Sequence, residues 1–301
     1  MAGRPSRLYR RAMADPKRPP RHHLTVAEAQ AIAEDVRHGR RERIADVRFP
    51  EKFQLQVGTL QGVTFENCSL WLTLGGGMLR GGVMEGCRFV DVDLDPLTIY
   101  GSELRDTRFE RVAFGVRAMG GMDDTRIDGG SFSDCRMVDF GFRKTRLAGV
   151  GIEGGRMDGV RFDMCSFIDI SLASAMRDVI LLDCAFERSD ISSADVVDVN
   201  LIDWRAADLR LPGRRTGFFV TPGVVSETLA ATPDALTSAF RDRVFTDLVM
   251  AGYDLVAVSE RFFTAELGAK PSDASTLVDA LFPHRLAALG EVRPAARTSR
   301  R

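Results

Sequence analysis

The chain has 301 residues, of which 45% are hydrophobic and 28% charged, and its formal net charge is −1. This balance is typical of a globular protein with enough apolar residues to bury a core. No apolar run approaches the roughly 18 residues of a membrane span, and no signal-peptide segment follows the Arg-rich start, so we expect a cytoplasmic protein without membrane contact.

The charges are distributed unevenly along the chain. Residues 1–57 carry a net +6, residues 58–211 carry −8 and residues 212–301 carry +1. Within residues 1–23 the basic side chains stand among Pro, Ser and Ala without an apolar period, which is typical of a disordered tail. A solvated tail is the simpler interpretation, and binding of nucleic acid through this tail is the alternative.

The first predicted element is a helix within residues 24–44. Thr25 and Glu28 have the spacing of a capping box, and they open a pattern of apolar residues at helical spacing that stops at Gly39. We expect this helix to cover the exposed end of the domain that follows it.

A period of five residues dominates the next segment. From Leu74, every fifth residue is apolar through ten positions to Met119, with Leu79 among them. After a slip in the sequence RAMGGMDD (117–124), the frame resumes at Met122 and holds through eleven positions to Leu172. Four-residue steps precede Leu74 and follow Leu172, and 31 apolar centres can be counted in all. A period of five belongs to neither a strand nor a helix.

The residue two places before each centre is usually small. All five cysteines occupy this position: Cys68, Cys87, Cys135, Cys165 and Cys184. Free cysteine behaves as a small, easily buried apolar residue, so the repeat accounts for these thiols without metal or redox chemistry. No two of them have CxxC spacing, and an odd number of isolated thiols indicates a reducing compartment.

The five-residue period predicts a solenoid. Apolar residues at this spacing can share one interior if the chain turns by about a quarter of a circuit per pentad, and stacked coils then pair as parallel strands about 4.8 Å apart. We therefore predict about seven to eight coils over residues 45–211. The predicted core includes Phe89, Leu94, Leu104, Phe109, Phe132, Phe162, Phe186, Cys87, Cys135 and Cys165.

The long run of five-residue repeats carries a family resemblance, and its closest local matches are Ala194-Asp195-Val196, Val199-Asn200-Leu201 and Ala207-Asp208-Leu209-Arg210. Over residues 53–211 the chain resembles the pentapeptide-repeat family, which implies a right-handed quadrilateral β-helix. The best understood members of that family mimic duplex DNA and bind type II topoisomerases such as DNA gyrase, and some confer quinolone resistance. The resemblance therefore implies such a partner as one alternative, although 17 basic residues interleave with the 25 acidic ones in residues 58–211.

The period of five ends after Leu211, and an α-helical region is predicted over residues 212–290, before a disordered tail at 291–301. One helix is expected to start at 232–234 and to end at Gly252, a second to cover 253–268, and a third to begin near Ser272 or Ser275. This region either caps the last coil or forms a homodimer or partner-binding surface.

The motif search identifies no catalytic centre. Residues 149–154 match the dinucleotide-binding fingerprint, but the five-residue frame runs through them where a strand, turn and helix would be required. The histidines lack a nucleophile or acidic partner at a catalytic spacing. We therefore expect no enzyme activity, cofactor, metal or small-molecule substrate.

The register slip at 117–124 is the predicted contact site, because irregularities on a rigid scaffold are where function concentrates. Asp123, Asp124 and the nearby Asp128 are its candidate partner-binding residues. The sequence thus predicts a non-enzymatic scaffold that binds a protein partner through its solenoid surface.

Overall fold

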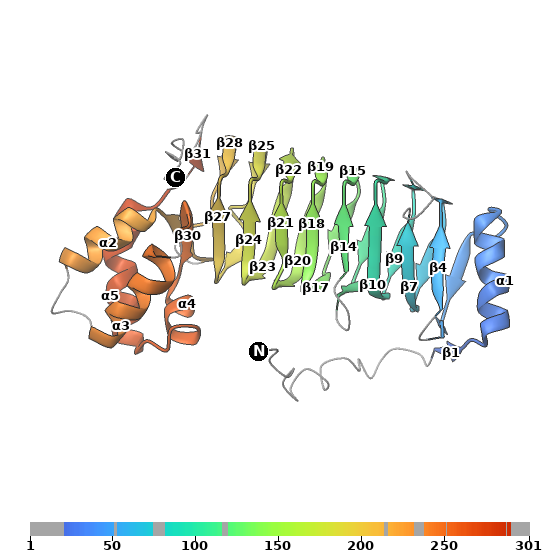
Figure 1. Cartoon of the computed structure of the whole chain (residues 1–301), viewed down its shortest axis with the longest axis horizontal. Helices are drawn as coiled ribbons and strands as arrows, with labels where there is room; N and C mark the ends of the chain where they lie inside the picture. The colour runs from blue at the N-terminus through green and yellow to red at the C-terminus, as the bar shows by residue number, and fades with distance from the viewer. Residues whose placement is uncertain are drawn as a thin grey trace, which may run out of the picture.

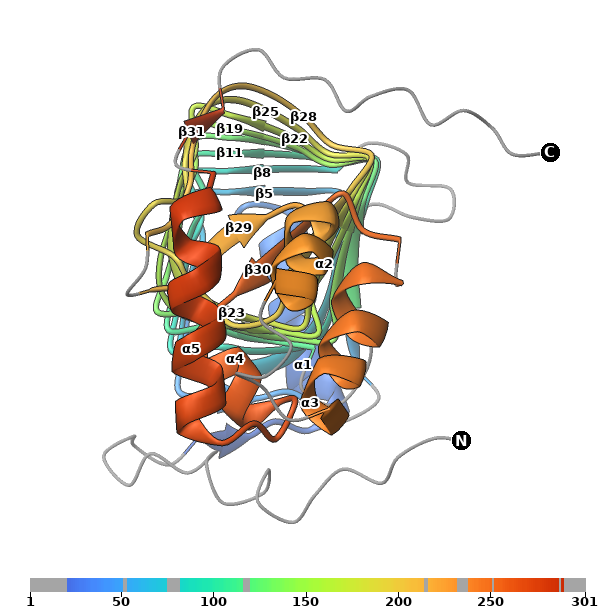
Figure 2. The same ribbon diagram turned by 90° about the vertical axis from the view of Figure 1, so that its left-hand side faces the viewer.

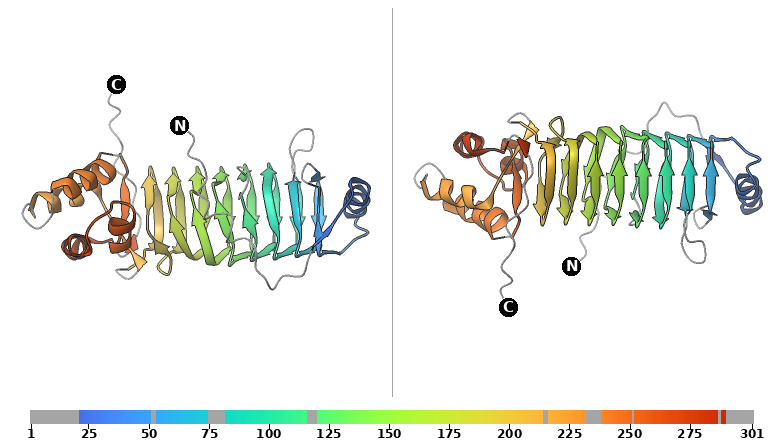
Figure 3. Two further views of the ribbon diagram at one scale, coloured as in Figure 1. Left: turned by 90° about the horizontal axis from the view of Figure 1, so that it is seen from below. Right: turned by 90° about the horizontal axis from the view of Figure 1, so that it is seen from above.

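The computed structural model describes residues 21–50, 53–74, 82–115, 120–213, 216–231, 238–250, 252–286 and 288–289. It is a straight β-solenoid with one helix at its N-terminal end and a helical domain at its C-terminal end (Figures 1 and 3). The predicted centres Leu79 and Met119 and most of both predicted tails lie outside the described residues.

The solenoid has four faces, and the chain visits them in order. Residues on the same face of successive coils pair in parallel, and Ile127, Leu147 and Phe167 show the twenty-residue step that four pentads produce. The four-sided outline is visible along the axis in Figure 2. The prediction of a parallel β-helix of about seven to eight coils is confirmed, since the solenoid has about eight turns.

The strands are assigned to faces by their pairing. The first face contains β2 (Arg43–Ala45), β6 (Thr64–Glu66), β9 (Arg88–Val90), β12 (Arg108–Glu110) and β16 (Ser131–Ser133). The second contains β3 (Val47–Arg48), β13 (Ala113–Phe114), β17 (Arg136–Val138) and β26 (Asp195–Val196). The third contains β4 (Gln54–Val57), β14 (Gly120–Asp123), β18 (Phe140–Arg143), β21 (Arg161–Asp163), β24 (Val179–Leu182) and β27 (Val199–Ile202). The fourth contains β5 (Thr59–Gln61), β8 (Val83–Glu85), β11 (Glu103–Arg105), β15 (Arg126–Asp128), β19 (Arg146–Ala148) and β22 (Ser166–Ile168).

Six longer strands bend from one face onto the next. They are β7 (Ser69–Leu74) and β10 (Asp93–Tyr100) on the second and third faces, β20 (Gly151–Asp158) and β23 (Ser171–Arg177) on the first and second, and β25 (Ala185–Asp190) and β28 (Arg205–Arg210) on the fourth and first. The fingerprint-like Gly149–Gly154 stretch thus enters a solenoid strand, where Ile152 pairs with Phe132 and Leu172.

The core is a stack of side chains along the axis. All ten residues predicted for it are at most 5% exposed. On the first face the rings of Phe65, Phe89, Phe109 and Phe132 stack with centroids 4.8 to 5.0 Å apart. All five cysteines are free and buried in the same core.

The register corrects three details of the predicted frame. Leu74 and Met84 occupy successive faces, and so do Phe114 and Met122. The chain therefore advances by only one face within each pair, where the predicted frame counted an additional centre. Leu209 pairs with Ser189, which lies two places before the centre Ile191. The local match at Ala207-Asp208-Leu209 is therefore out of frame.

Left-handed corners explain much of the acidic composition. Sixteen described non-glycine residues have positive φ, and eleven of them are aspartates, with Asn67 as a twelfth Asx residue. Most of these residues lie two places after a centre, where the chain turns onto the next face. Asp and Asn tolerate this conformation better than other L-residues, so the fold itself selects an acidic side chain there.

The N-terminal end is closed by α1 (Val26–Arg37). The predicted capping box is present, since the Thr25 hydroxyl accepts from the Glu28 amide at 3.2 Å and the Glu28 carboxylate accepts from the Thr25 amide at 2.7 Å. The segment 21–23, predicted as part of a disordered tail, is ordered: β1 (His22–His23) pairs with β3, and Arg21 forms an ion pair with Asp93.

The C-terminal end is closed by antiparallel strands as well as helices. β29 (Phe218–Val220) pairs with β30 (Leu255–Val258), β30 pairs with β27, and β31 (Ala288–Leu289) pairs with β28. The predicted helix over 253–268 is therefore wrong in its first half. Leu255–Val258 saturates the open edge of the last coil, and α4 (Glu260–Ala265) begins after Ser259, whose hydroxyl accepts from the Phe262 amide.

The remaining helices form a second core. They are α2 (Pro222–Ala231), α3 (Ser238–Val244), a π-helix (Phe245–Val249), α5 (Pro271–Leu281) and a 3₁₀ turn (Phe282–His284). In β30, Leu255 and Ala257 join the solenoid core, whereas Val256 and Val258 join the helical core. The strand pair is therefore the layer between two hydrophobic cores.

A glycine-floored groove as the candidate functional site

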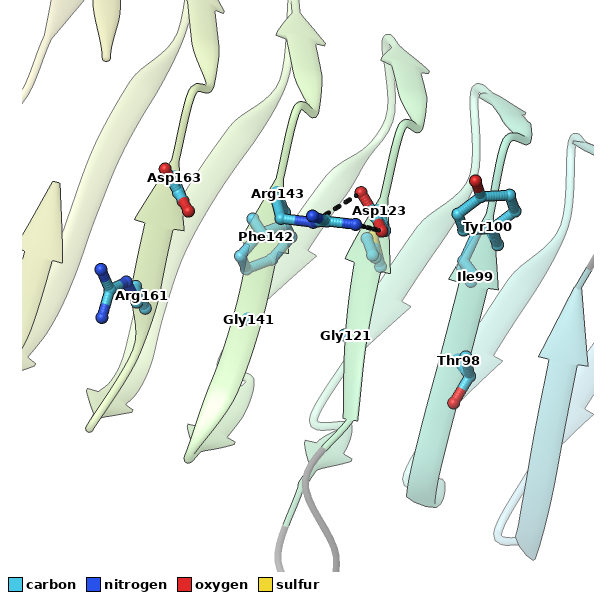
Figure 4. Close-up of a pocket in the computed structure, with 11 residues that line it drawn as sticks. Thr98, Ile99, Tyr100, Gly121, Asp123, Gly141, Phe142, Arg143, Arg161 and Asp163 are labelled. Carbon is cyan, nitrogen blue, oxygen red and sulfur yellow. Dashed lines mark hydrogen bonds and ion pairs between the residues drawn. The ribbon is translucent and has the colours of Figure 1, made fainter. Parts of the chain in front are cut away.

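A shallow groove of about 400 Å³ lies on the third face. Its floor crosses four consecutive coils, at Thr98 of β10, Gly121 of β14, Gly141 of β18 and Arg161 of β21 (Figure 4). Each is the outward-facing residue before a buried centre, so the strand alternation of the solenoid aligns these four residues.

A second row of side chains stands beside this floor: Tyr100, Asp123, Arg143 and Asp163. Arg143 reaches across to the preceding coil and donates two hydrogen bonds to Asp123, one of them 3.0 Å long (Figure 4). The Asp123 carboxylate raises the pKa of the Arg143 guanidinium. Tyr100 is 47% exposed, which is unusual for a large side chain of this solenoid.

The two floor glycines differ in what surrounds them. A Cβ added to Gly121 would lie 2.8 Å from the Gly141 carbonyl oxygen, so crowding excludes a side chain there. A Cβ added to Gly141 would meet no atom within 4 Å, and its φ is not positive. Glycine weakens a strand, and in a strand interior it often marks a place where a ligand or another backbone approaches closely.

Arg161 is the unpaired cation of this groove. Within the described part of the chain, the Arg161 side chain forms no ion pair or hydrogen bond, whereas that of Arg143 on the preceding coil is held by Asp123. An exposed guanidinium offers a fork of donors that fits a carboxylate or a phosphate.

Of the three predicted contact residues, Asp123 lines this groove, Asp124 follows it at the next corner and Asp128 lies on the fourth face. Two of the three are already paired. Asp123 binds Arg143, and Asp128 lies between Arg126 and Arg146, with an Arg146 contact of 3.1 Å. Asp124 is a corner residue with a φ of 49°, and its amide donates to the Arg143 carbonyl. The three aspartates thus follow one another along one coil but are divided between two faces and a corner, and arginines offset the charge of Asp123 and Asp128.

Sequence reasoning missed the floor of the groove. Its members are 20 or 23 residues apart in the sequence, so no local motif contains them. The available signal was glycine at the same outward position on consecutive coils, at Gly121 and Gly141.

A row of aspartates follows the corner between the second and third faces. Asp139 and Asp178 stand at this corner with positive φ, and Asp198 stands there between β26 and β27; none of the three forms an ion pair among the described residues. Burial, followed by repulsion from Asp158 and Asp139, raises the pKa of Asp178. Burial also raises the pKa of Asp198, although Asn200 donates to it at 3.0 Å.

The described residues show neither a membrane helix nor a metal cluster. None of the helices within the described ranges has the length and hydropathy needed to span a bilayer. In the same ranges, no group of three or more His, Cys, Asp and Glu side chains is arranged to hold a metal ion.

No known protein-family profile matches the sequence, and no curated protein matches it. Similar solved structures include QnrB1, a plasmid-mediated fluoroquinolone resistance protein, with 12% identity, a TM-score of 0.27, and coverage of 51% of this chain and 82% of that one. HetL, a pentapeptide repeat protein involved in heterocyst differentiation regulation in the cyanobacterium Nostoc sp. strain PCC 7120, has 11% identity, a TM-score of 0.27, and coverage of 58% and 86%. The chain's own five-residue period and four-sided solenoid are consistent with the pentapeptide-repeat family.

Proposed function

We propose that this chain is a non-enzymatic scaffold that binds a protein partner, and that the partner occupies the glycine-floored groove. The open space above Gly141 is the observation that carries the proposal. A side chain would fit there without strain and would strengthen the strand, yet the position is empty and is followed on the next coil by the unpaired Arg161.

The pKa is raised in four of the five cysteines, which supports a binding role over covalent catalysis. A hydrogen bond with Cys184 lowers the pKa of the fifth, Cys165, but that residue is only 2% exposed. Burial raises the pKa of the Cys68 thiol to about 11 and that of Cys135 to about 12. The thiolate is the nucleophilic form of cysteine, so buried thiols with raised pKa values are poor nucleophiles.

The test compares two valine variants of the full chain. Gly141→Val fills the groove, whereas Gly151→Val adds the same side chain to the first face, where a Cβ would meet only the Glu153 carboxylate within 4 Å, at 3.9 Å. Wild type and both variants are immobilised, host proteins are captured, and the captured proteins are quantified by mass spectrometry. We expect a partner that is retained by wild type and Gly151→Val and lost from Gly141→Val, and whose binding is then reproduced with purified protein. Identical capture by all three proteins would contradict the proposal.

A second candidate function is modulation of a type II topoisomerase by DNA mimicry, and the unpaired aspartate row favours it. Asp139, Asp178 and Asp198 repeat along the axis at one corner and form no ion pair within the described ranges, although Arg177 lies close enough to Asp178 and Asp198 to oppose the rise in their pKa values. In a DNA gyrase supercoiling assay, stoichiometric protein should inhibit or protect the enzyme, duplex DNA should compete, and higher salt should weaken the effect. Replacing the three aspartates by Asn should relieve it. No effect of wild type at any salt concentration would exclude this candidate.

A further inference from the structure

We propose that the groove recognises an extended acidic peptide lying along the solenoid axis, with an apolar side chain on the glycine floor and a carboxylate on Arg161. This inference rests on the proposed function and names the chemistry of its partner. It follows from the length of the groove, the shape of its floor and the position of its free charge.

The dimensions of the groove fit a short stretch of extended chain. Its floor spans the strands β10, β14, β18 and β21, and neighbouring strands lie about 4.8 Å apart, so its outer strands are separated by about 14 Å. An extended peptide advances about 3.4 Å per residue, so about four residues cover this distance. The strands beneath are paired on both sides, so side-chain contacts and not strand addition must provide the affinity.

The floor selects an apolar side chain. Gly121 and Gly141 leave room for one side chain between Tyr100 at one end and Arg161 at the other. Tyr100 presents its half-exposed ring to this end of the groove, and the peptide backbone of the two glycines is already hydrogen-bonded within the sheet. Such a surface forms mainly van der Waals contacts, so an aliphatic or aromatic side chain should bind it more tightly than a polar one.

The charges select an acid at the Arg161 end. Asp123 is neutralised by Arg143, which leaves the Arg161 guanidinium and the Asp163 carboxylate as the two lining charges without an ion pair to any residue that the structure describes; of these, Arg161 is the one that can bind an acid. A bidentate contact with a carboxylate would satisfy its guanidinium. A nucleic-acid backbone would bring further phosphates close to Asp123 and Asp163, which favours a peptide with one acid over a polyanion.

The spacing of the two contacts predicts a motif. Gly141 and Arg161 pair on adjacent strands, about 4.8 Å apart, and the arginine side chain adds reach along the groove. Side chains two residues apart in an extended peptide point the same way at a separation of about 7 Å. We therefore expect an apolar residue followed by Glu or Asp two places later.

The probe is the fluorescein-labelled, amidated peptide Gly-Ser-Leu-Ser-Glu-Ser-Gly, compared with the same peptide carrying Gln instead of Glu. Fluorescence polarisation with the full chain at low salt should show about tenfold tighter binding of the Glu peptide, as expected for one charge-assisted contact. R161Q should reduce this ratio to near one. G141V should weaken both peptides, and G151V should change neither.

Several outcomes would overturn the inference. No saturable binding of the Glu peptide up to about 1 mM, equal binding of both peptides, or a Glu preference that survives R161Q would each exclude the acidic-peptide class. A duplex oligonucleotide whose binding is weakened by both R161Q and G141V would assign the groove to nucleic acid instead. If a captured protein partner still depends on Gly141 while the peptides show no discrimination, the proposed function stands and this inference fails.

Discussion

Truncation of Phe109 is the sharpest test of the stacked core. Its ring is 1% exposed and lies between Phe89 and Phe132, with centroid distances of 5.0 and 4.8 Å, and it meets Phe114 edge-on at 5.4 Å. Phe→Ala substitutions in cores cost about 3 to 5 kcal/mol, through lost burial and the cavity left behind. Each aromatic pair contributes about 0.5 to 1.5 kcal/mol beyond burial, so three lost pairs place Phe109→Ala at the upper end of that range.

The assay is urea unfolding followed by the β-sheet signal in circular dichroism, and two controls accompany it. Glu110→Ala, on the same strand, removes a partly exposed carboxylate that contacts Arg88 and Arg111, and it should cost less than about 1 kcal/mol. Phe245→Ala removes the same side chain where it is 42% exposed, and it should also cost less than about 1 kcal/mol. A loss below about 1.5 kcal/mol for Phe109→Ala, or similar losses at Phe109 and Glu110, would refute the inward stack.

Three further predictions concern the thiols, the buried acids and the corners. All five cysteines should resist labelling in the native state and react after denaturation, because they are buried; rapid native labelling of three or more would contradict this. The pKa of Asp198 is higher in the folded state than its ordinary value of 3.8. Above the folded-state pKa, the ionised carboxylate therefore destabilises the fold, and this destabilisation disappears as the pH falls from the folded-state pKa toward 3.8. Asp198→Asn should therefore raise the Tm most at neutral pH and progressively less in acid, and a gain that grows in acid would have the wrong sign. Asp183, with a φ of 50°, should tolerate Asn, whereas Asp183→Val should cost about 1 to 2 kcal/mol in urea unfolding, and equal stability of the two variants would show that the left-handed corner is not selective.

The period of five was sufficient to predict the fold because burial in a solenoid is strictly periodic. Leu94, Leu104 and Phe162 lie on three different faces, and all of them are buried because each is the centre of its pentad. The five-residue spacing alone therefore predicted the core residues. The five-residue spacing gave a wrong count of faces between Leu74 and Met84, where apolar residues keep this spacing although the chain advances by one face only. Leu74 and Met84 lie ten residues apart in the predicted frame, but they are one face step apart in the coil.

In the C-terminal cap, the local sequence pattern was insufficient to distinguish a strand from a helix. Leu255–Val258 stands between helical segments, and a four-residue apolar run fits a strand or a buried helix equally well. The exposed edge of the last coil decided the outcome, because unpaired strand groups of β27 are satisfied by a strand and not by a helix. The groove was equally inaccessible to local reasoning, since Thr98, Gly121, Gly141 and Arg161 become neighbours through the coil alone.

The acidic composition of the repeats has two separate origins, and they carry different weight for function. At the corners, left-handed backbone selects aspartate whatever the partner, as at Asp106, Asp134 and Asp169. Arginines of the next coil then offset several of these charges: Arg188 donates two hydrogen bonds to Asp169, and the pKa of that carboxyl is lowered as a result. A net charge of −8 over residues 58–211 is therefore weak evidence for DNA mimicry. The informative acids are those for which the chain supplies no cation, because an unpaired, partly buried carboxylate costs stability that a turn residue such as Asn or Gly would not.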